Sequence, residues 1–300
     1  MSSRLDRRMH AQKKMRKSAY SIMNKVLVYV GLIIATLFVL FPFAIILVTS
    51  FKTQADAMDM TFTLIGRKDG FSLQGYKSVF EYKDSNGVPL IFTGLLNTLL
   101  VSVLPTISSL FLSALAAFAF AKIKFKASKV FFDILIFTMM IPGTILIIPH
   151  YMMYEWLGWI NTYAPLIVPT LWGGATTIFF LRQFMYGIPD SLIEAAKLDG
   201  LSYFGIFIKI ITPLIVPSLL AQGLLGFITR YNNYLGPMLY LQDRDMFTLQ
   251  LVVANFNSYA RTNKPAIMAM SMLTITPILI IYAIFQNYFV EGISTSGMKL

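Results

Sequence analysis

The sequence predicts an all-α integral membrane protein with six transmembrane helices. Of its 300 residues, 56% are hydrophobic and only 13% are charged, and its mean hydropathy is +0.66. A soluble domain of this size carries about 25% charged residues. The apolar residues form long uninterrupted runs, whereas the strands of a membrane barrel would alternate in hydrophobicity over ~10 residues. A soluble fold is therefore excluded, and membrane-spanning helices are favoured.

Six apolar runs have the length of a membrane span. A helix needs ~20 residues to cross a hydrocarbon core of ~30 Å, and each run is close to or above that length. We expect the spans at residues 26–50, 91–121, 130–149, 163–184, 207–229 and 266–289. They form one domain, 26–289, between a basic arm at 1–25 and a cytoplasmic tail at 290–300, of which residues 294–300 are expected to be polar and flexible.

The positive charge is placed to set topology. The net charge is +11, and eight of the first 25 residues are Lys or Arg, directly before an apolar run. This arrangement predicts an anchor on anionic lipid headgroups, not a nucleic-acid partner. With both termini in the cytoplasm, the inner segments hold 16 of the 25 basic residues and the outer segments hold 9. The loop Lys122–Lys129 gives the clearest positive-inside signal.

The middles of the predicted spans carry no ionisable residue. An ion-coupled secondary transporter, the main rival function, usually keeps such groups at mid-membrane. The sequence also lacks cysteine, a phosphate-binding G-x-x-x-x-G-K-[ST] loop and a cluster of metal ligands. We therefore predict no enzyme activity and no cofactor or metal on this chain, and expect any transport energy to come from a partner.

A short polar segment interrupts the apolar sequence at residues 190–200. Ser191 followed three residues later by Glu194 predicts a capping box, and Gly200 stands where a helix C-terminus favours positive φ. A helix of about two turns is too short to be stable alone. We expect the rest of the chain to hold this helix and present it to another protein.

The same segment resembles the EAA signature of ABC importer membrane subunits. The resemblance rests on Glu194-Ala195-Ala196, on Gly200 and on Pro213, and it departs from the signature at Thr212. The stretches Asn97-Thr98-Leu99, Gly158–Thr162, Phe180–Phe184 and Gln286–Gly292 resemble the carbohydrate-uptake branch of that family. The likeness covers residues 25–297.

This resemblance implies a fold, a location and partners. It implies the type I ABC importer fold in the cytoplasmic (inner) membrane of a prokaryote. The partners would be a second permease subunit, an ABC ATPase dimer that binds the ATP and Mg, and an extracytoplasmic solute-binding protein. Residues 190–205 would be the coupling helix, with Leu192, Ile193 and Leu198 as apolar contacts. The expected coupling residues are Ser191, Glu194, Ala195, Ala196, Lys197, Asp199 and Gly200.

Two further sets of residues are candidates for substrate and partner contact. Tyrosine rings and Asn amides can bind sugars, and hydroxyls at helical spacing can line a polar path. An interfacial aromatic belt and hydrogen bonds between helices remain open as alternatives. The path candidates are Asn97, Ser102, Thr106, Tyr231, Asn232, Asn233 and Tyr234. By resemblance, binding-protein contact is expected at Asp243, Arg244, Asn255 and Asn257.

Small residues recur every four positions on the second span, at Ser109, Ser113, Ala117 and Ala121. Such a stripe allows close helix approach, either within this chain or against a sister subunit. Together the patterns predict a permease subunit of an ATP-driven oligosaccharide importer. A permease for a polyol or glycerol phosphate is the alternative within the same class, and an assembly factor without transport is disfavoured.

Overall fold

A computed structural model describes residues 2–59, 63, 66 and 70–297 of the chain, with side chains described between 23 and 286. Across these residues the regular structure is helical, with one isolated β-bridge between Lys83 and Pro89. The elements are α1 (Ser2–Ser50), α2 (Gln54–Met58), α3 (Gln74–Glu81), α4 (Leu90–Lys122), α5 (Ser128–Met139), η1 (Gly143–Leu146), α6 (Ile147–Trp156), α7 (Ala164–Ile167), η2 (Val168–Thr170), α8 (Ala175–Tyr186), α9 (Asp190–Leu198), α10 (Tyr203–Ile206), η3 (Phe207–Ile211), α11 (Thr212–Tyr231), α12 (Leu235–Tyr240), η4 (Arg244–Met246), α13 (Leu249–Tyr259) and α14 (Lys264–Gly297).

Within the described residues, five helical segments are long and apolar enough to cross a membrane. They are Met23–Ser50, Leu90–Lys122, Ala164–Tyr186, Tyr203–Tyr231 and Lys264–Gln286. The prediction of one helix at 130–149 is wrong in form, because α5 and η1–α6 meet at an 82° bend. Pro142 stands at that break, where it removes a backbone donor and disfavours helical backbone before it. Counting the bent pair as one span restores the predicted six.

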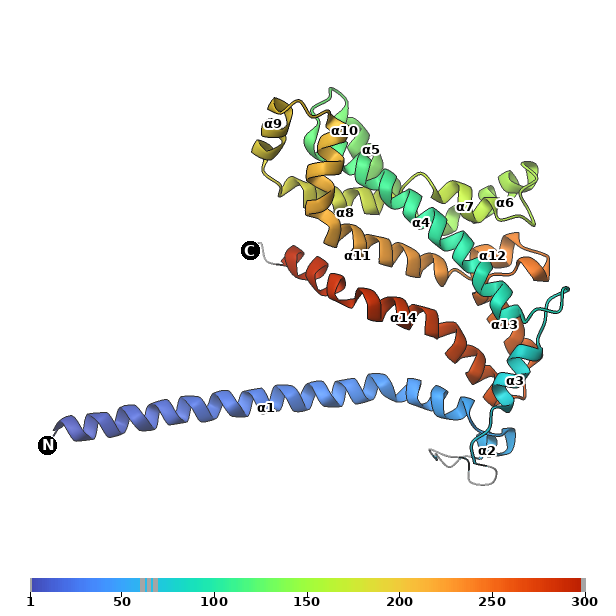
Figure 1. Cartoon of the computed structure of the whole chain (residues 1–300), viewed down its shortest axis with the longest axis horizontal. Coiled ribbons are helices and arrows are strands. Elements are labelled where there is room, and N and C mark those ends of the chain that lie inside the picture. The colour runs from blue at the N-terminus through green and yellow to red at the C-terminus, as the bar shows by residue number, and fades with distance from the viewer. Residues whose placement is uncertain (1, 60–62, 64–65, 67–69, 298–300) are drawn as a thin grey trace.

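The long helices run from one end of the molecule towards the other. In Figure 1 the N-terminus, the C-terminal end and α9 lie on the left, whereas α2, α3, α12 and α13 lie on the right. The segments predicted to be cytoplasmic therefore lie opposite the segments predicted to be outside. Helix α4 runs between the two ends and packs against α8, α11 and α13.

The stripe of small residues packs inside the chain. Ser109, Ser113 and Ala117 are buried, and the Ser113 hydroxyl accepts a 3.1 Å hydrogen bond from the Gly174 N–H. A Cβ at Gly173 would lie 2.9 Å from the Ser113 Oγ, and Gly173 has a φ of +97°. Close approach of α4 to the start of α8 thus needs small residues on both sides. At these three positions the small residues therefore pack within the chain, which was one of the two alternatives, the other being packing against a sister subunit.

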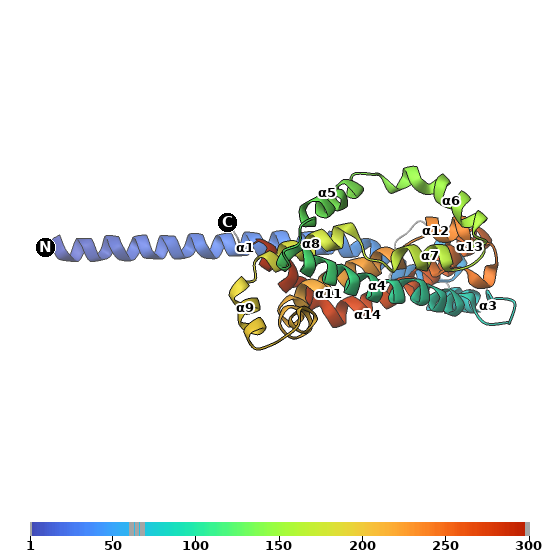
Figure 2. The ribbon, with the colours of Figure 1, turned by 90° about the horizontal axis from the view of Figure 1, so that it is seen from above.

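The N-terminal part of helix α1 stands apart from the remaining helices (Figures 1 and 2), whereas α1 also packs against α14. It continues the first span back through the basic arm as a single helix of 49 residues. Its described apolar side chains between Met23 and Phe41 are exposed, although the span is the most hydrophobic of the five. Such a surface requires lipid or another subunit to cover it. At the other terminus, α14 continues to Gly297, so residues 294–297, which were expected to be flexible, are helical, and residues 298–300 lie outside the described part.

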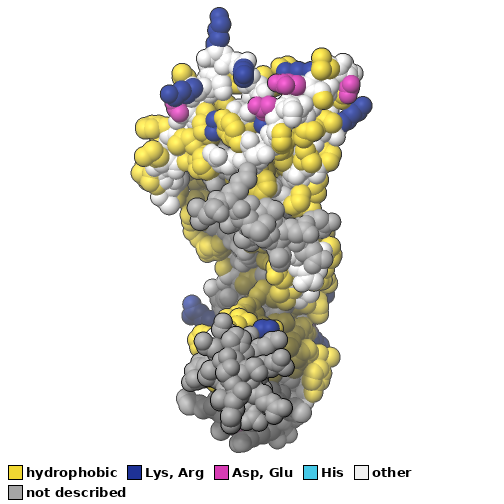
Figure 3. Space-filling model, turned by 90° about the vertical axis from the view of Figure 1, so that its left-hand side faces the viewer, with side chains coloured by type: hydrophobic (Ala, Val, Ile, Leu, Met, Phe, Trp, Pro, Cys, Tyr) yellow, Lys and Arg dark blue, Asp and Glu magenta, His cyan; other side chains and the backbone are white. Residues whose placement is uncertain are grey.

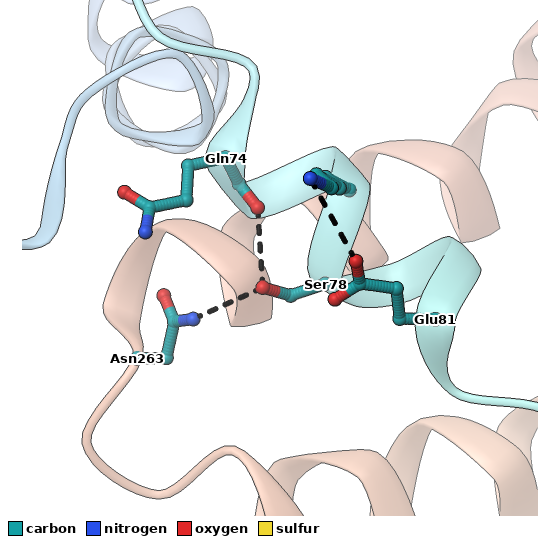
Figure 4. A network of polar contacts seen from close by, with 5 residues as sticks. Gln74, Ser78, Glu81 and Asn263 are labelled. Atoms are coloured by element: carbon teal, nitrogen blue, oxygen red, sulfur yellow. Dashed lines mark hydrogen bonds and ion pairs between the residues drawn. The ribbon is translucent and has the colours of Figure 1, made fainter.

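The outer end is held together by contacts with the start of α14. Gly75 on α3 approaches so closely that a Cβ there would lie 2.7 Å from the Pro265 carbonyl carbon and oxygen. Figure 4 shows Asn263 donating to the Ser78 hydroxyl at 3.4 Å, while that hydroxyl donates to the Gln74 carbonyl at 3.1 Å. These contacts fix α3 on the outer surface.

Candidate functional site

Helix α9 lies at one end of the bundle, with one face packed and the other open. Ile193 and Ala196 are buried in a cluster that includes Leu181 and Met185 of α8 and Phe207 of η3. On the opposite side Leu198 is 90% exposed. A short helix of this kind is stabilised by tertiary packing, since its own propensity does not suffice. The expected arrangement, a helix held by the chain and open to a partner, is present.

The predicted capping box at the start of α9 is wrong. The helix begins at Asp190, Pro189 occupies the N-cap position, and no side chain there makes a cap hydrogen bond. Ser191 consequently lies inside the first turn, two positions after the N-cap. Proline favours the helix entry because its φ is fixed and its missing N–H is not needed there. The negative charge at this end comes from Asp190, which the helix dipole favours.

The Asp190 carboxylate binds Lys122, a residue that sequence reasoning treated only as topology signal. The Lys122 Nζ lies 2.7 Å from Asp190 Oδ1 and donates to the Ile188 carbonyl at 2.6 Å. The Lys122 side chain is only 3% exposed, whereas that of Asp190 is 74% exposed. The hydrogen bond from Lys122, followed by its charge and that of Lys124, lowers the pKa of Asp190. The end of α4 is thereby tied to the start of α9.

The end of α9 matches the prediction for Gly200. Its φ is +81°, the Leu201 N–H bonds to the Ala196 carbonyl at 3.0 Å, and the Gly200 N–H bonds to the Lys197 carbonyl at 3.0 Å. This pair of bonds is a Schellman motif, which favours glycine at the left-handed position. Lys197 also donates to the Tyr203 hydroxyl at 2.9 Å. The turn between α9 and α10 is therefore held by the backbone hydrogen bonds at Gly200 and Leu201 and by the side-chain hydrogen bond from Lys197 to Tyr203.

Thr212, the departure from the EAA signature, has a structural role. Residues Phe207–Ile211 form one π-helical turn, and Thr212 donates both its N–H and its hydroxyl to the Phe207 carbonyl, the latter at 2.8 Å. The next residue, Pro213, cannot donate, and its ring crowds the preceding turn. A wider turn relieves that crowding. A side chain without a hydroxyl at this position would leave only the backbone N–H to bind the Phe207 carbonyl.

The structure divides the expected coupling residues into two groups. Those that lie on the exposed surface are Ser191, Glu194, Ala195, Lys197, Asp199 and Gly200. Ala196 is buried, as is Ile193, so both anchor α9 to its own chain. The expectation of partner contact at these two residues is wrong for this conformation, since their side chains face inward.

A cavity of about 880 Å³ adjoins the start of α9. It lies between the end of α4, α5 and α8, and its charged lining residues are Lys122, Lys124, Lys126, Lys129, Asp133, Arg182 and Asp190. Arg182 lies over the Phe132 ring at 3.6 Å and donates to the Tyr186 hydroxyl at 2.6 Å. Figure 3 shows charged side chains gathered at the top of this view, where Figure 1 places α9 and the α4–α5 loop. The predicted basic loop thus lies beside α9.

At the opposite end, the expected binding-protein residues lie on a connected outer surface. Asn161 donates to the Asp243 carboxylate at 2.7 Å, and its own Oδ1 accepts from the Gln242 and Asp243 N–H groups at 3.0 Å each. Arg244 lies over the Tyr82 ring at 4.2 Å. Asn255 and Asn257 are exposed on α13. The Gly158–Thr162 motif therefore has a structural role, because its Asn161 holds the loop that carries Asp243.

The substrate-path candidates do not form one surface. Tyr231 is buried and donates to the Thr274 carbonyl at 2.9 Å, so the prediction that its ring stacks on sugar is wrong in this conformation. Asn97 donates to the Asp245 and Phe247 carbonyls at 2.9 and 3.0 Å, a structural role between α4 and the outer loop. Asn232, Asn233 and Tyr234 are exposed. Ser102 and Thr106 are buried on one face of α4.

A helical bundle of up to six spans, with a short helix exposed at one end and an ordered outer surface at the other, is typical of a multi-pass membrane transport subunit. The chain belongs to the family of binding-protein-dependent transport system inner membrane components, whose model matches residues 109–295. This result confirms the ABC importer resemblance that the EAA signature indicated. The protein is therefore an ABC transporter permease, a membrane component that is not itself catalytic.

Known proteins of this class align over nearly the whole chain. The arabinooligosaccharides transport system permease protein AraQ of Halalkalibacterium halodurans is 32% identical over 91% of this chain and 96% of its own. The trehalose/maltose transport system permease protein MalG of Thermococcus litoralis is 29% identical over 93% and 98%. The crystal structure of a bacterial ABC transporter involved in the import of the acidic polysaccharide alginate contains a chain that is 26% identical. That chain matches with a TM-score of 0.74 over 90% of this chain and 96% of its own.

Proposed function

We propose that this permease forms half of the translocation path of an ATP-driven oligosaccharide importer and that α9 transmits ATPase motion to it. The observation that carries the proposal is the construction of α9. Its inner face is buried against α8 and η3, while Leu198 on its outer face is 90% exposed. A force applied to the outer face reaches the spans through packed side chains and the Lys122–Asp190 pair.

The outer face of α9 offers a partner a specific chemistry. Leu192 and Leu198 provide apolar area, and Ala195 is small enough for close approach. Glu194 and Asp199 are exposed carboxylates that can pair with basic groups. An ABC ATPase, which would bind the ATP and Mg itself, is the partner that the family membership favours.

The assembly would contain a second permease subunit and an extracytoplasmic solute-binding protein. The first span supports the former, because its described apolar residues are exposed along most of its length. The outer loop supports the latter, because Asn161, Asp243 and Arg244 give it a fixed shape beside the segment at 83–85. A loaded binding protein would favour the outward-facing state by binding it more tightly than the inward-facing state.

Oligosaccharides are the proposed substrates because the relatives described above are named for the transport of arabinooligosaccharides, of trehalose and maltose, and of the polysaccharide alginate. The test is ATPase stimulation in the complete complex, reconstituted with its binding protein and offered a panel of oligosaccharides, polyols and glycerol phosphate. Stimulation by an oligosaccharide supports the proposal. Stimulation by a polyol or glycerol phosphate alone would replace it with the alternative solute class.

A further inference from the structure

The guanidinium of Arg230 lies in an unusual position for a basic residue near the end of a membrane span. It is the penultimate residue of α11, close to the outer end of the span. A long cation in such a position normally extends to the membrane surface, where water solvates the charge. The Arg230 Nη1 instead turns back along the helix and donates to the Gly226 carbonyl at 3.2 Å and to the Thr106 hydroxyl at 3.5 Å. Thr106 lies near the middle of the 33-residue helix α4.

Gly226 provides the space for this arrangement. A Cβ at position 226 would lie 3.0 Å from the Arg230 Nη1 and 3.9 Å from the Thr106 Cγ2. Any side chain there would therefore press on the guanidinium. Because Gly226 on α11 has no side chain, the Arg230 guanidinium fits between α11 and the Thr106 hydroxyl on α4.

No described side chain balances the positive charge of the Arg230 guanidinium. Arg230 forms no ion pair with a described carboxylate, since none lies within 4.0 Å of its guanidinium. The Arg230 Nε is buried and has no hydrogen-bond partner, and the same holds for the Ser102 hydroxyl, one helical turn from Thr106 on the same face of α4. A half-buried cation without a counter-charge is costly, which points to an anion that arrives from elsewhere.

We propose that Arg230 determines substrate specificity by binding the carboxylate of an acidic sugar, of the uronic acid class, as it passes along the path. A planar guanidinium with five donors matches a carboxylate in geometry, and the Thr106 and Ser102 hydroxyls suit the hydroxyls of the same sugar ring. Asn232, Asn233 and Tyr234 follow directly and are exposed, so the outer end of α11 borders open space in this chain. This inference rests on the proposed oligosaccharide function and narrows it.

The experiment compares an acidic sugar with its uncharged ester. The complete complex, with its binding protein, is reconstituted in proteoliposomes and offered trigalacturonate, the methyl ester of trigalacturonate, or a neutral arabinotriose. ATPase stimulation and uptake are measured for wild type, Arg230→Gln and Arg230→Lys. Arg261→Gln is the matched control, because Arg261 is an exposed basic residue in the loop before α14.

We expect trigalacturonate to stimulate wild type more than its ester does. Arg230→Gln should lower the response to trigalacturonate about tenfold, the effect of losing a charge-assisted contact. Arg230→Lys should retain part of it, since the charge remains. Copurification of the second permease with Arg230→Gln should stay as in wild type, and Arg261→Gln should behave as wild type in every measurement.

Three results would overturn the inference. If only the neutral sugar or the ester stimulates wild type, the oligosaccharide function stands and the acidic class is wrong. If Arg230→Gln responds to trigalacturonate as wild type does, Arg230 does not contact the carboxylate. If the second permease no longer copurifies with Arg230→Gln, the counter-charge belongs to that subunit. Failure of every sugar would instead overturn the proposed function itself.

Discussion

The ammonium group of Lys122 lies 2.7 Å from the carboxylate of Asp190, and this pair joins the last residue of α4 to the first residue of α9. The buried ammonium also caps the Ile188 carbonyl, so it orders the chain just before α9. Helix α4 runs the length of the bundle and meets the outer loop through Asn97. The pair therefore gives α9 a direct mechanical connection to the outer end.

Replacing Lys122 tests this connection. Lys122→Met removes a charged hydrogen bond to Ile188, worth about 1.5–3 kcal/mol, and frees the start of α9. We expect ATP-driven uptake to fall strongly while ATPase activity persists without stimulation by substrate. Lys126→Met is the control, since Lys126 is an exposed lysine in the same loop. Equal uptake by the two variants would remove Lys122 from the coupling mechanism.

The pH dependence of this anchor follows from Asp190. The hydrogen bond from Lys122, and then the charges of Lys122 and Lys124, lower the pKa of Asp190 from its usual 3.8. A carboxyl with a lowered pKa stabilises the fold above its unfolded-state pKa, and the contribution is lost as the pH falls through the folded-state pKa. The difference in unfolding temperature between wild type and Asp190→Asn should thus stay constant between about pH 5 and pH 8. A difference that changes in that range would show that another group controls the anchor.

Gly200 tests the turn after α9. Its φ of +81° is strained for a β-branched residue, whereas no described atom lies near enough to obstruct a Cβ. Gly200→Val should cost about 1–3 kcal/mol through backbone strain and reorient the turn, so uptake should uncouple from ATP hydrolysis. Gly200→Asn should retain most uptake, because Asn tolerates this conformation. Uptake that is normal in the valine variant would contradict a coupling role for the turn.

Gly173 tests the packing of α4 on α8. An added Cβ would lie 2.9 Å from the Ser113 Oγ, and the φ of +97° is unfavourable for alanine. Gly173→Ala should lower the stability of the purified permease by about 1–3 kcal/mol, the usual cost of overpacking. The unfolding temperature in detergent measures this. Gly143→Ala serves as the control, since a Cβ at Gly143 meets no described atom within 4 Å.

The sequence predicted the spans and the turn at Gly200 because hydropathy and left-handed backbone are local properties of the chain. It could not predict the start of α9 at Asp190, since that depends on how neighbouring segments pack. Tyr231 shows the same limit. A tyrosine at the end of a span is compatible with a sugar contact or with burial, and only the hydrogen bond to the Thr274 carbonyl of α14 decides between them.

The roles of Lys122 and Arg230 were not predicted from the sequence. Lys122 was treated only as part of a charge pattern, and counting charges treats every basic residue alike. A signal was available for Lys122, because a lysine in the last turn of a helix followed 68 residues later by an acid at a helix start suits a tertiary ion pair. No sequence pattern indicated that Arg230 would turn inward, which depends on the space left by Gly226.

The central claim is that the outer face of α9 contacts the ATPase, and cysteine cross-linking tests it most directly. The chain has no native cysteine, so a single introduced thiol is unique in it. Leu198→Cys on α9 and Tyr259→Cys on α13 replace residues that are 90% and 72% exposed at opposite ends of the bundle. In the assembled complex, a short thiol-to-amine cross-linker should join the ATPase to position 198 and not to position 259. An ATPase adduct at 259, or none at 198, would contradict the account.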